Sequence, residues 1–301
     1  MHRLLLALAL GVPLAAQTDL GRVLPEDAPL HVLAFGDFGS GNQHQTDIAQ
    51  AMLRKHGQEH FNLGLTLGDN FYRCGVRGIH DSKWTTRWEN LYTPLGIPFY
   101  ATLGNHDYGH PVGICPFHRG SPAAEVSYTG HSKSWHMPAK YYTYAAGPAR
   151  FFALDTEGWG EEQFAWLQKA LEASANEPGI RWRIVYGHHP VLSSGHHANE
   201  RRIGVLRRQL GPLFQTAKVD LYVCGHDHSL ERLSWDGVDL LIAGGGGASL
   251  RFDTRPKAES KFASVKYGFL ELSIDARKIA AQYYDVDLQP LDTNPLTRNI
   301  R

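Results

Sequence analysis

Five short motifs of this chain carry side chains that can bind metal ions, and each motif follows an apolar run. They are Gly36-Asp37-Phe38-Gly39, Gly68-Asp69-Asn70-Phe71-Tyr72, Gly104-Asn105-His106-Asp107, Gly187-His188-His189 and Gly225-His226-Asp227-His228. Carboxylate oxygens suit hard cations, and imidazole nitrogens suit Fe, Zn or Mn. Because apolar runs of this length read as buried strands, the motifs predict five strand ends that face one metal site.

A pair of metal ions would support the hydrolysis of a phosphate ester. Two ions about 3.5–4 Å apart can generate a nucleophile and offset the charge of the phosphoryl group. The leaving group needs a nearby acid, which is most often His. Ions this close need a bridging carboxylate, from Asp37 or Asp69, while the neutral Asn105 limits repulsion of the substrate. The phenolate of Tyr72 favours an ion of high charge such as Fe(III), so the sequence predicts iron in at least one site.

Each of these residues alone has a simpler explanation. An Asp after a strand is often a turn residue, and a single Tyr usually belongs to the core. Two His separated by one residue, as in His226 and His228, also occur in ordinary turns. The metal interpretation depends on all five motifs recurring at strand ends.

Strands and amphipathic helices alternate over most of the chain, which predicts an α/β fold. The expected strands are His31–Phe35, Phe61–Leu67, Phe99–Leu103, Arg150–Leu154, Arg181–Tyr186 and Asp220–Cys224. The expected helices are Thr46–His56, Asp81–Leu91, Glu161–Ala173 and Asn199–Gln215.

From Leu230 onward only strands are expected, so the C-terminal third should form a second, largely antiparallel sheet. The expected strands are Leu230–Trp235, Val238–Ala243, Gly268–Ile274 and Lys278–Asp285. The Asp236-Gly237 pair is a hairpin signal between the first two of them.

Two stretches show little periodic pattern. Residues 107–138 are rich in Gly, Pro and His, and a loop this long in a compact domain tends to be functional or mobile. Gly244-Gly245-Gly246-Gly247 lacks the Lys-Ser/Thr of a nucleotide-binding loop, and no helix is expected after it. Close approach of this backbone to the metal site is therefore the favoured interpretation.

The composition limits the partners that this chain could bind. Lys+Arg and Asp+Glu both total 30, so there is no bulk charge that favours nucleic acid or an anionic membrane. No basic patch with interleaved aromatic residues is present, so nucleic acid is not expected as a partner. Six of the 17 histidines lie between His188 and His228, and this clustering favours a metal site.

The N-terminus has the pattern of a secretory signal peptide. Met1-His2-Arg3 precedes an apolar run that ends at Leu10, and the small residues Ala15 and Ala16 follow. The run is shorter than the roughly 20 residues of a membrane span, and no later segment is apolar enough to cross a bilayer. We expect a signal peptide at 1–16, a catalytic domain at 28–290, a tail at 291–301 and an exported protein, periplasmic or secreted. A buried N-terminal helix is the alternative, which Pro13 and Pro25 disfavour.

The five motifs, in this order and spacing, resemble the signature of the calcineurin-like metallophosphoesterases. That signature is Gly-Asp-x-Gly, Gly-Asp-x-x-Tyr, Gly-Asn-His-Asp, Gly-His and Gly-His-x-His. The Tyr of the second motif is similar to that of the purple acid phosphatases, and the length looks most like their small, tartrate-resistant acid phosphatase type. The resemblance extends from His31 to about Val286. It implies an α/β, two-sheet βαββαβ-type sandwich with flanking helices and a dinuclear metal site at the C-terminal ends of the strands.

The resemblance also implies a role for each motif residue. A trivalent iron would be bound by Asp37, Asp69, Tyr72 and His228. The second metal, Fe(II), Zn(II) or Mn(II), would be bound by Asp69, Asn105, His188 and His226, with Asp69 as the bridge. His106 and His197 would bind phosphate and assist the leaving group, although the neighbouring His196 is an alternative for the second of these.

Several positions depart from the family pattern. The loop before Glu161 is short, so the proteolytic activation of the animal enzymes is not expected. His189 stands where a Tyr is common, and we expect it to pack beside the site. Cys74 and Cys115 both depart from the family near the same face, which suggests a Cys74–Cys115 disulfide; two unrelated loop thiols are the alternative. Cys224 lies in an apolar run and is expected to be an inert core thiol.

The predicted function is that of an exported, metal-dependent acid phosphatase that hydrolyses phosphate monoesters by in-line attack of a metal-bound hydroxide. Its expected partner is a small phosphate ester. One alternative is a phosphodiesterase or nucleotide phosphatase of the same superfamily, because the same metals can cleave diesters. A non-catalytic metal- or phosphate-binding protein would require a broken site, and every expected ligand is present.

Overall fold

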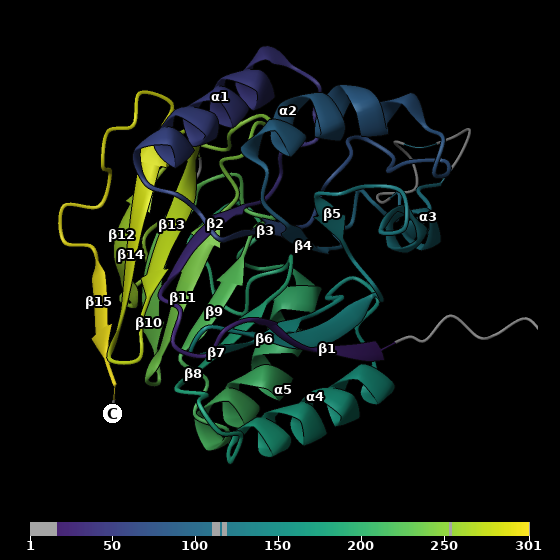
Figure 1. Cartoon of the computed structure of the whole chain (residues 1–301). Helices are drawn as coiled ribbons and strands as arrows, with labels where there is room; N and C mark the ends of the chain where they lie inside the picture. The colour runs from purple at the N-terminus through teal and green to yellow at the C-terminus, as the bar shows by residue number, and fades with distance from the viewer. Residues whose placement is uncertain (1–16, 110–114, 116–118, 253–254, 301) are drawn as a thin grey trace, which may run out of the picture.

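The computed structural model describes residues 17–109, 115, 119–252 and 255–300. Within these residues two β-sheets pack against each other, and helices cover their outer faces (Figure 1). This arrangement confirms the expected α/β two-sheet sandwich. The expected signal peptide at 1–16 lies outside the described residues. None of the described helices has both the length and the apolar character needed to span a bilayer.

The first sheet has seven strands among the described residues, in the order β15-β14-β13-β2-β3-β4-β5. Their bounds are Leu30–Phe35 for β2, Leu63–Leu67 for β3, Phe99–Thr102 for β4, Trp135–His136 for β5, Gly268–Ile274 for β13, Lys278–Asp285 for β14 and Leu296–Asn299 for β15. Strands β2, β3 and β4 run parallel, so their C-terminal ends meet at one edge.

The second sheet has eight strands in the described part of the chain, in the order β1-β6-β7-β8-β9-β11-β10-β12. Their bounds are Gln17–Leu24 for β1, Tyr141–Ala146 for β6, Ala149–Ala153 for β7, Trp182–Tyr186 for β8, Leu221–Cys224 for β9, Leu230–Trp235 for β10, Val238–Ala243 for β11 and Ser260–Ser264 for β12. Strands β7, β8 and β9 are parallel and nearly completely buried, as their apolar runs predict.

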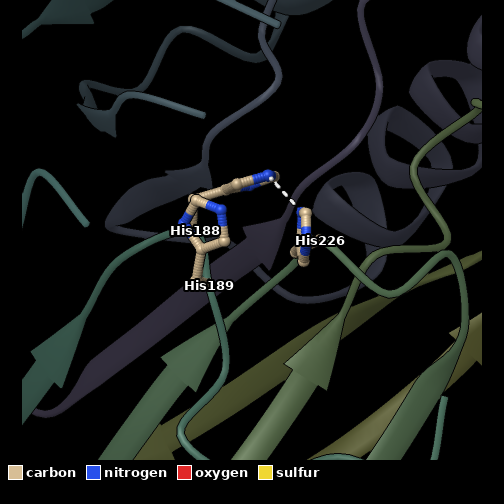
Figure 2. Close-up of side chains that lie close together, drawn as sticks. All are labelled: His188, His189 and His226. Carbon is tan, nitrogen blue, oxygen red and sulfur yellow. Dashed lines mark hydrogen bonds between the residues drawn. The ribbon is translucent and has the colours of Figure 1, made fainter. Parts of the chain in front are cut away.

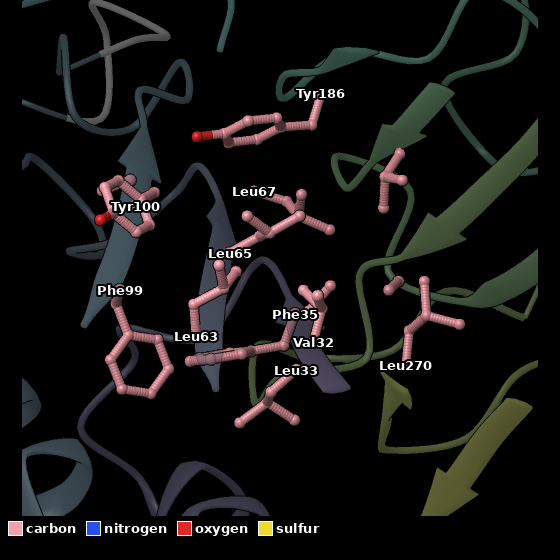
Figure 3. Close-up of a cluster of buried hydrophobic side chains, with 14 of the residues drawn as sticks. Val32, Leu33, Phe35, Leu63, Leu65, Leu67, Phe99, Tyr100, Tyr186 and Leu270 are labelled. Atoms are coloured by element: carbon pink, nitrogen blue, oxygen red, sulfur yellow. The ribbon is translucent and has the colours of Figure 1, made fainter. Parts of the chain in front are cut away.

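Helices lie on opposite sides of the sandwich. One side of the sandwich is covered by α1 (Gln43–Gln58) and α2 (Asn90–Tyr92), with the π-helical turn Trp84–Glu89 and the short helix Thr93–Leu95 (Figure 1). The other side is covered by α4 (Glu161–Ser174) and α5 (Arg201–Thr216). The short helix α3 (Pro122–Tyr128) stands near β5. The main core includes Val32, Leu65, Tyr186 and Leu270, whose side chains come from both sheets (Figure 3). Burying this apolar surface holds the strand ends of the two sheets in a fixed relation.

The prediction that the C-terminal third forms its own sheet was wrong. Strand β11 pairs with β9, and β13 pairs with β2, so the C-terminal strands are divided between the two sheets. Alternation of polar and apolar residues identifies a strand but does not identify its partner.

Some elements lie outside the expected bounds. Strand β15 lies within the expected tail, and β1 precedes the expected domain start at residue 28. The stretch 107–138 contains α3 and β5 rather than only loop. The expected helix Asp81–Leu91 is a π-helical turn that continues into α2.

Candidate metal centre

The seven predicted metal ligands meet where strands of the two sheets end. Asp37, Asp69 and Asn105 follow β2, β3 and β4 of the first sheet, and His188 and His226 follow β8 and β9 of the second. Tyr72 and His228 lie a few residues further along the same loops. In open α/β sheets, sites form outside the C-terminal ends of parallel strands, and here two such edges face each other.

The first group of donor atoms surrounds the phenol of Tyr72. Its hydroxyl oxygen lies 2.8 Å from Asp69 Oδ2, 3.2 Å from Asp37 Oδ1 and 3.1 Å from His228 Nε2. His228 Nε2 is also 3.5 Å from Asp37 Oδ1. We call this group of Asp37, Asp69, Tyr72 and His228 the tyrosine set.

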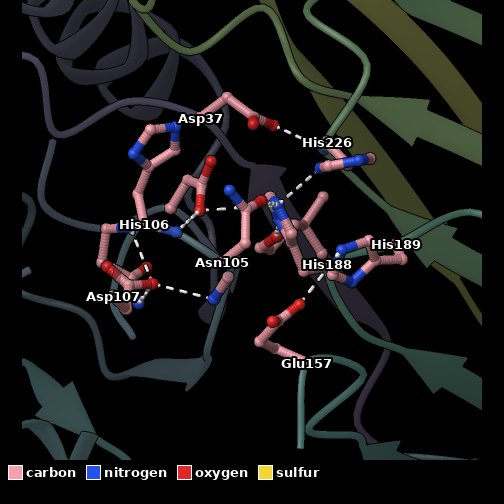
Figure 4. A network of polar contacts seen from close by, with 12 residues as sticks. Asp37, Asn105, His106, Asp107, Glu157, His188, His189 and His226 are labelled. Atoms are coloured by element: carbon pink, nitrogen blue, oxygen red, sulfur yellow. Dashed lines mark hydrogen bonds and ion pairs between the residues drawn. The ribbon is translucent and has the colours of Figure 1, made fainter. Parts of the chain in front are cut away.

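The second group of donor atoms surrounds His188 Nε2. This nitrogen lies 3.1 Å from Asn105 Oδ1 and 3.1 Å from His226 Nδ1 (Figure 4). It also lies 3.5 Å from Asp69 Oδ1. We call this group of Asp69, Asn105, His188 and His226 the histidine set. Asp69 contributes one carboxylate oxygen to each set, which is the arrangement that a bridging ligand requires.

The hydrogen bonds of the three imidazoles determine which nitrogens carry a proton. His188 Nδ1 donates to the Leu67 carbonyl (2.8 Å), and His228 Nδ1 donates to the Ser249 carbonyl (2.6 Å), because a carbonyl only accepts. His226 Nε2 donates to the carboxylate of Glu200 (3.0 Å). When these rings are neutral, the other nitrogen of each presents a lone pair toward the site.

The facing lone pairs fit a bound cation. His188 Nε2 and His226 Nδ1 point at each other 3.1 Å apart (Figure 2), and two lone pairs at this distance repel unless a proton or cation lies between them. Ligating histidines usually donate their second N–H to a carbonyl or carboxylate, as all three do here. Two carboxylates, an amide, a phenol and three imidazoles together match the ligands of two first-row transition metals.

The electrostatics of the site favour an ionised carboxylate at its centre. Asp69 is almost completely buried, which by itself raises the pKa of the carboxyl group, but the neighbouring His188 and His106 bring that pKa down to about 2. Burial, with the charges of Asp69 and Asp37, raises the pKa of the Tyr72 phenol well above its ordinary value. A highly charged cation at the tyrosine set would reverse this effect and favour the phenolate.

Three of the predicted ligands have a backbone conformation that side chains rarely adopt. The φ angles of Asp37, Asp69 and His226 are 57°, 51° and 70°. Non-glycine residues at positive φ are uncommon, and such conformations persist where the surrounding structure enforces them. Their coincidence at the ends of β2, β3 and β9 supports a functional role for these loops.

Glycines let the loops approach one another closely. A Cβ atom on Gly104 would lie 2.2 Å from Asp69 Oδ1, and one on Gly244 would lie 2.8 Å from Asp37 Oδ2. Both distances are far below a van der Waals contact. Gly244 therefore serves the close backbone approach that was predicted for the four consecutive glycines.

Buried carboxylates hold the loops that carry the ligands. Asp107 accepts hydrogen bonds from the backbone N–H groups of Asn70 (3.1 Å), Phe71 (3.0 Å) and Gly104 (2.8 Å), which ties the second motif to the third. Asp227 accepts from the N–H of His197 (2.8 Å) and from the hydroxyl of Ser193. The segment that carries His197 is thus anchored to the fifth motif.

Two further histidines complete the lining of the site. His106 Nδ1 contacts the carbonyl oxygen of Arg73 at 2.6 Å, and His197 Nδ1 contacts Glu200 Oε1 at 2.6 Å. The His197 ring lies against His226, with 4.3 Å between ring centroids. His197, and not the exposed His196, lines the same cavity as the donor atoms.

Glu200 was missed in the sequence, although it contacts two site histidines. It follows His197 by three residues, immediately before α5, where a polar residue is usually read as a helix cap. Burial raises the pKa of its carboxyl group, but the hydrogen bonds from His197 and His226 lower that pKa by more, so Glu200 is a carboxylate.

His189 lies outside the two donor sets. Its Nδ1 contacts the Thr156 hydroxyl at 2.9 Å, and its Nε2 lies 3.5 Å from Glu157 Oε2. The ring packs against His226 with centroids 4.3 Å apart (Figure 2). Burial lowers the pKa of His189 well below its ordinary value, which leaves a neutral ring beside the site.

The cysteines adopt the expected states. Cys74 and Cys115 form a disulfide with 5.8 Å between their Cα atoms, which confirms the predicted pairing. Cys224 is a buried thiol whose pKa is raised by burial, so it is poorly reactive.

A cavity of about 800 Å³ opens onto both donor sets. It is lined by Ser40, Asn42, Asp69, Tyr72, Arg73, Arg87, Asn105, His106, His197, His226, His228, Ala248, Ser249 and Arg251. A space of this size accepts a small organic molecule.

Known proteins of similar sequence and structure match this chain. The calcineurin-like phosphoesterase family matches residues 30–230, a span that contains all seven predicted ligands. The chain is 28% identical over 299 residues to purple acid phosphatase 7 of Arabidopsis thaliana, covering 90% of this chain and 87% of that protein. It is 30% identical over 277 residues to tartrate-resistant acid phosphatase type 5 of Homo sapiens, covering 79% of each.

Among solved structures, the chain is similar to GAP50, described as the anchor in the inner membrane complex of Plasmodium. The TM-score is 0.77 at 22% identity, and the match covers 91% of this chain and 89% of that one. At this identity the likeness concerns the fold alone.

Proposed function

Since this chain belongs to the calcineurin-like phosphoesterase family and is related over most of its length to purple and tartrate-resistant acid phosphatases, we propose that it is an exported acid phosphatase that hydrolyses phosphate monoesters. One observation supports this most strongly. Two donor sets share the carboxylate of Asp69, and residues of both sets line one cavity together with His106 and His197.

The donor sets suit different metals. Asp37, Asp69, Tyr72 and His228 would hold Fe(III), because a phenolate ligand favours an ion of high charge. Asp69, Asn105, His188 and His226 would hold Fe(II), Zn(II) or Mn(II). When bound, such a pair supplies a nucleophile at moderate pH and offsets the charge of the phosphoryl group.

His106 and His197 are proposed to act on the substrate. Each has its Nδ1 engaged, by the Arg73 carbonyl or by Glu200, so Nε2 is left for the phosphoryl oxygens or for the leaving oxygen. The contact with Glu200 holds the His197 ring in position beside the donor sets. A positioned acid near the leaving oxygen contributes roughly 10²–10⁴-fold to the rate.

Export is supported by two features of the chain. The first 16 residues have the composition of a signal peptide, and the disulfide between Cys74 and Cys115 suits an oxidising compartment. Expression with and without residues 1–16 tests this. The full chain should be recovered outside the cytoplasm in a form that starts near Gln17, and recovery of uncleaved protein in the cytoplasm would contradict it.

Phosphodiester hydrolysis is the second candidate, because the cavity of about 800 Å³ has room for a second ester group. Kinetics with p-nitrophenyl phosphate and bis-p-nitrophenyl phosphate separate the two. We expect kcat/KM to be at least tenfold higher for the monoester, with a maximum at acidic pH. A preference for the diester would replace the first proposal with the second, and no hydrolysis of either by metal-loaded protein would reject both.

A further inference from the structure

Two arginines stand on the rim of the cavity without an assigned role. Arg73 directly follows Tyr72, and Arg251 lies two residues after Ser249; both line the cavity that contains the donor atoms. Both side chains are exposed. Among the described residues, neither guanidinium makes a hydrogen bond or an ion pair.

Arg87, which lines the same cavity, is in a different situation. Its Nη1 donates to the carbonyl oxygens of Gly39 (2.8 Å) and Tyr72, so it ties the first motif to the second. Arg87 is therefore used within the fold. Arg73 and Arg251 keep their hydrogen-bond donors for a molecule in the cavity.

The segment that carries each rim arginine is held by a site histidine. The carbonyl oxygen of Arg73 lies 2.6 Å from His106 Nδ1, and the next residue, Cys74, is fixed by its disulfide. The carbonyl oxygen of Ser249 lies 2.6 Å from His228 Nδ1. Ala248 N donates to the Asp37 carbonyl (2.8 Å), which fixes the start of the second segment. Both arginines thus extend from anchored segments that touch the metal centre.

The reacting phosphoryl group does not account for these two charges. In the proposed function, two cations with His106 and His197 already surround that group. Arg presents a planar fork of donors that matches the geometry of a phosphate. The chain as a whole has equal totals of Lys+Arg and Asp+Glu, so these two guanidinium groups are a local positive charge. They are suited to bind an anion that lies closer to the cavity mouth than the reacting phosphoryl group.

We propose that Arg73 and Arg251 bind a second phosphate on the leaving group, so that the site prefers substrates with two phosphates, such as a nucleoside diphosphate, over simple monoesters. This inference rests on the proposed function, because it assumes that the terminal phosphoryl group reacts at the donor sets. The two arginines would hold the adjacent phosphate and thereby orient the bond that breaks. They determine specificity and take no part in the proton transfers.

Kinetics of ADP and p-nitrophenyl phosphate test the proposal with Arg73→Gln, Arg251→Gln and the double variant. A hydrogen bond to a charged group contributes about 1.5–3 kcal/mol. Because Arg73 and Arg251 are exposed, the lower end of this range applies to each, which corresponds to about a tenfold change in kcat/KM. We expect each single change to lower the ratio of kcat/KM for ADP to that for p-nitrophenyl phosphate about tenfold. Arg73→Lys and Arg251→Lys should restore part of the ratio. Arg77→Gln, an exposed arginine lining a different hollow, is the matched control and should leave the ratio unchanged.

A binding measurement separates this proposal from the proposed function. Adenosine 5′-(α,β-methylene)diphosphate has two phosphorus groups and resists hydrolysis between them, so calorimetry with metal-loaded protein needs no turnover. If p-nitrophenyl phosphate is not hydrolysed but the analogue binds about tenfold more weakly to each Gln variant, the proposed function fails and the arginine site stands. If both substrates and the analogue are affected equally, or not at all, the second-phosphate site is overturned.

Discussion

Replacing Glu200 with Gln should weaken the metal site at the histidine set without unfolding the protein. The Glu200 carboxylate accepts from His226 Nε2 at 3.0 Å and from His197 Nδ1 at 2.6 Å. A Gln side chain is of the same size, but its amide nitrogen cannot accept a hydrogen bond. One of the two imidazoles therefore loses its acceptor, and His226 loses a negative charge that keeps its Nδ1 lone pair directed at the metal.

The expected magnitude follows from the exposure of Glu200. Changing a group that supports a ligating histidine typically costs 10–100-fold in metal affinity. The Glu200 side chain is 42% exposed, and solvent screens its interactions, so the lower end applies. We expect about tenfold weaker binding of the second metal in Glu200→Gln, and a larger loss in Glu200→Ala.

Chelator competition measures this directly, with the metal content of each variant followed during the titration. The exposed Glu172 on α4 offers a matched control, and Glu172→Gln should bind both metals as the unchanged protein does. If Glu200→Gln binds both metal ions with affinities within twofold of those of the unchanged protein, the idea that Glu200 holds His226 in its ligating form is refuted. Loss of both ions together would refute the separation into two donor sets.

Three further predictions concern the tyrosine set, the disulfide and a buried acid. Tyr72→Phe should abolish or shift the visible charge-transfer absorption of the iron-loaded protein, and a colourless iron-loaded protein before mutation would contradict a phenolate ligand to Fe(III). Replacing Cys74 and Cys115 by Ser should lower the free energy of unfolding in urea by about 4 kcal/mol, since the bond closes a loop with a sequence separation of 41; a loss below about 1 kcal/mol would show that the link constrains little. Burial, with the charge of Asp107, raises the pKa of Glu125 well above its ordinary value, so the folded chain keeps a proton that the unfolded chain releases above about pH 4.5. The stability that this proton contributes therefore falls as pH rises, by up to about 1.4 kcal/mol per pH unit. Glu125→Gln should make the free energy of unfolding less dependent on pH between 5 and 7. An unchanged slope would mean that Glu125 is ionised in the folded protein.

The convergence of the predicted ligands was predictable because parallel strands place their C-terminal ends together. An apolar run followed by Gly-Asp or Gly-His gives both the strand and its end, and the structure brings all seven predicted residues into two donor sets. The order of the motifs along the chain also corresponds to two groups of neighbouring strands, with β2, β3 and β4 in one sheet and β8 and β9 in the other.

The supporting residues were not predictable from the same patterns. Glu200 contacts His226, which is 26 residues away, and Arg251 comes close to the site through a loop that no periodicity describes. The pairing of β13 with β2 joins two segments that lie far apart in the sequence, and the alternation within β13 gives no sign of its partner. The positive φ angles of Asp37, Asp69 and His226 reflect enforcement by the packed loops, which no single residue type indicates.

The central claim is that one bridging carboxylate holds two metal ions at the ends of these strands. Anomalous diffraction from crystals of the metal-loaded protein tests it most directly, with data collected at the absorption edges of iron and zinc. The account predicts two peaks that share Asp69, an iron peak beside Tyr72 and His228 and a second peak between His188 and His226. A single peak, or two peaks that do not share Asp69, would contradict it.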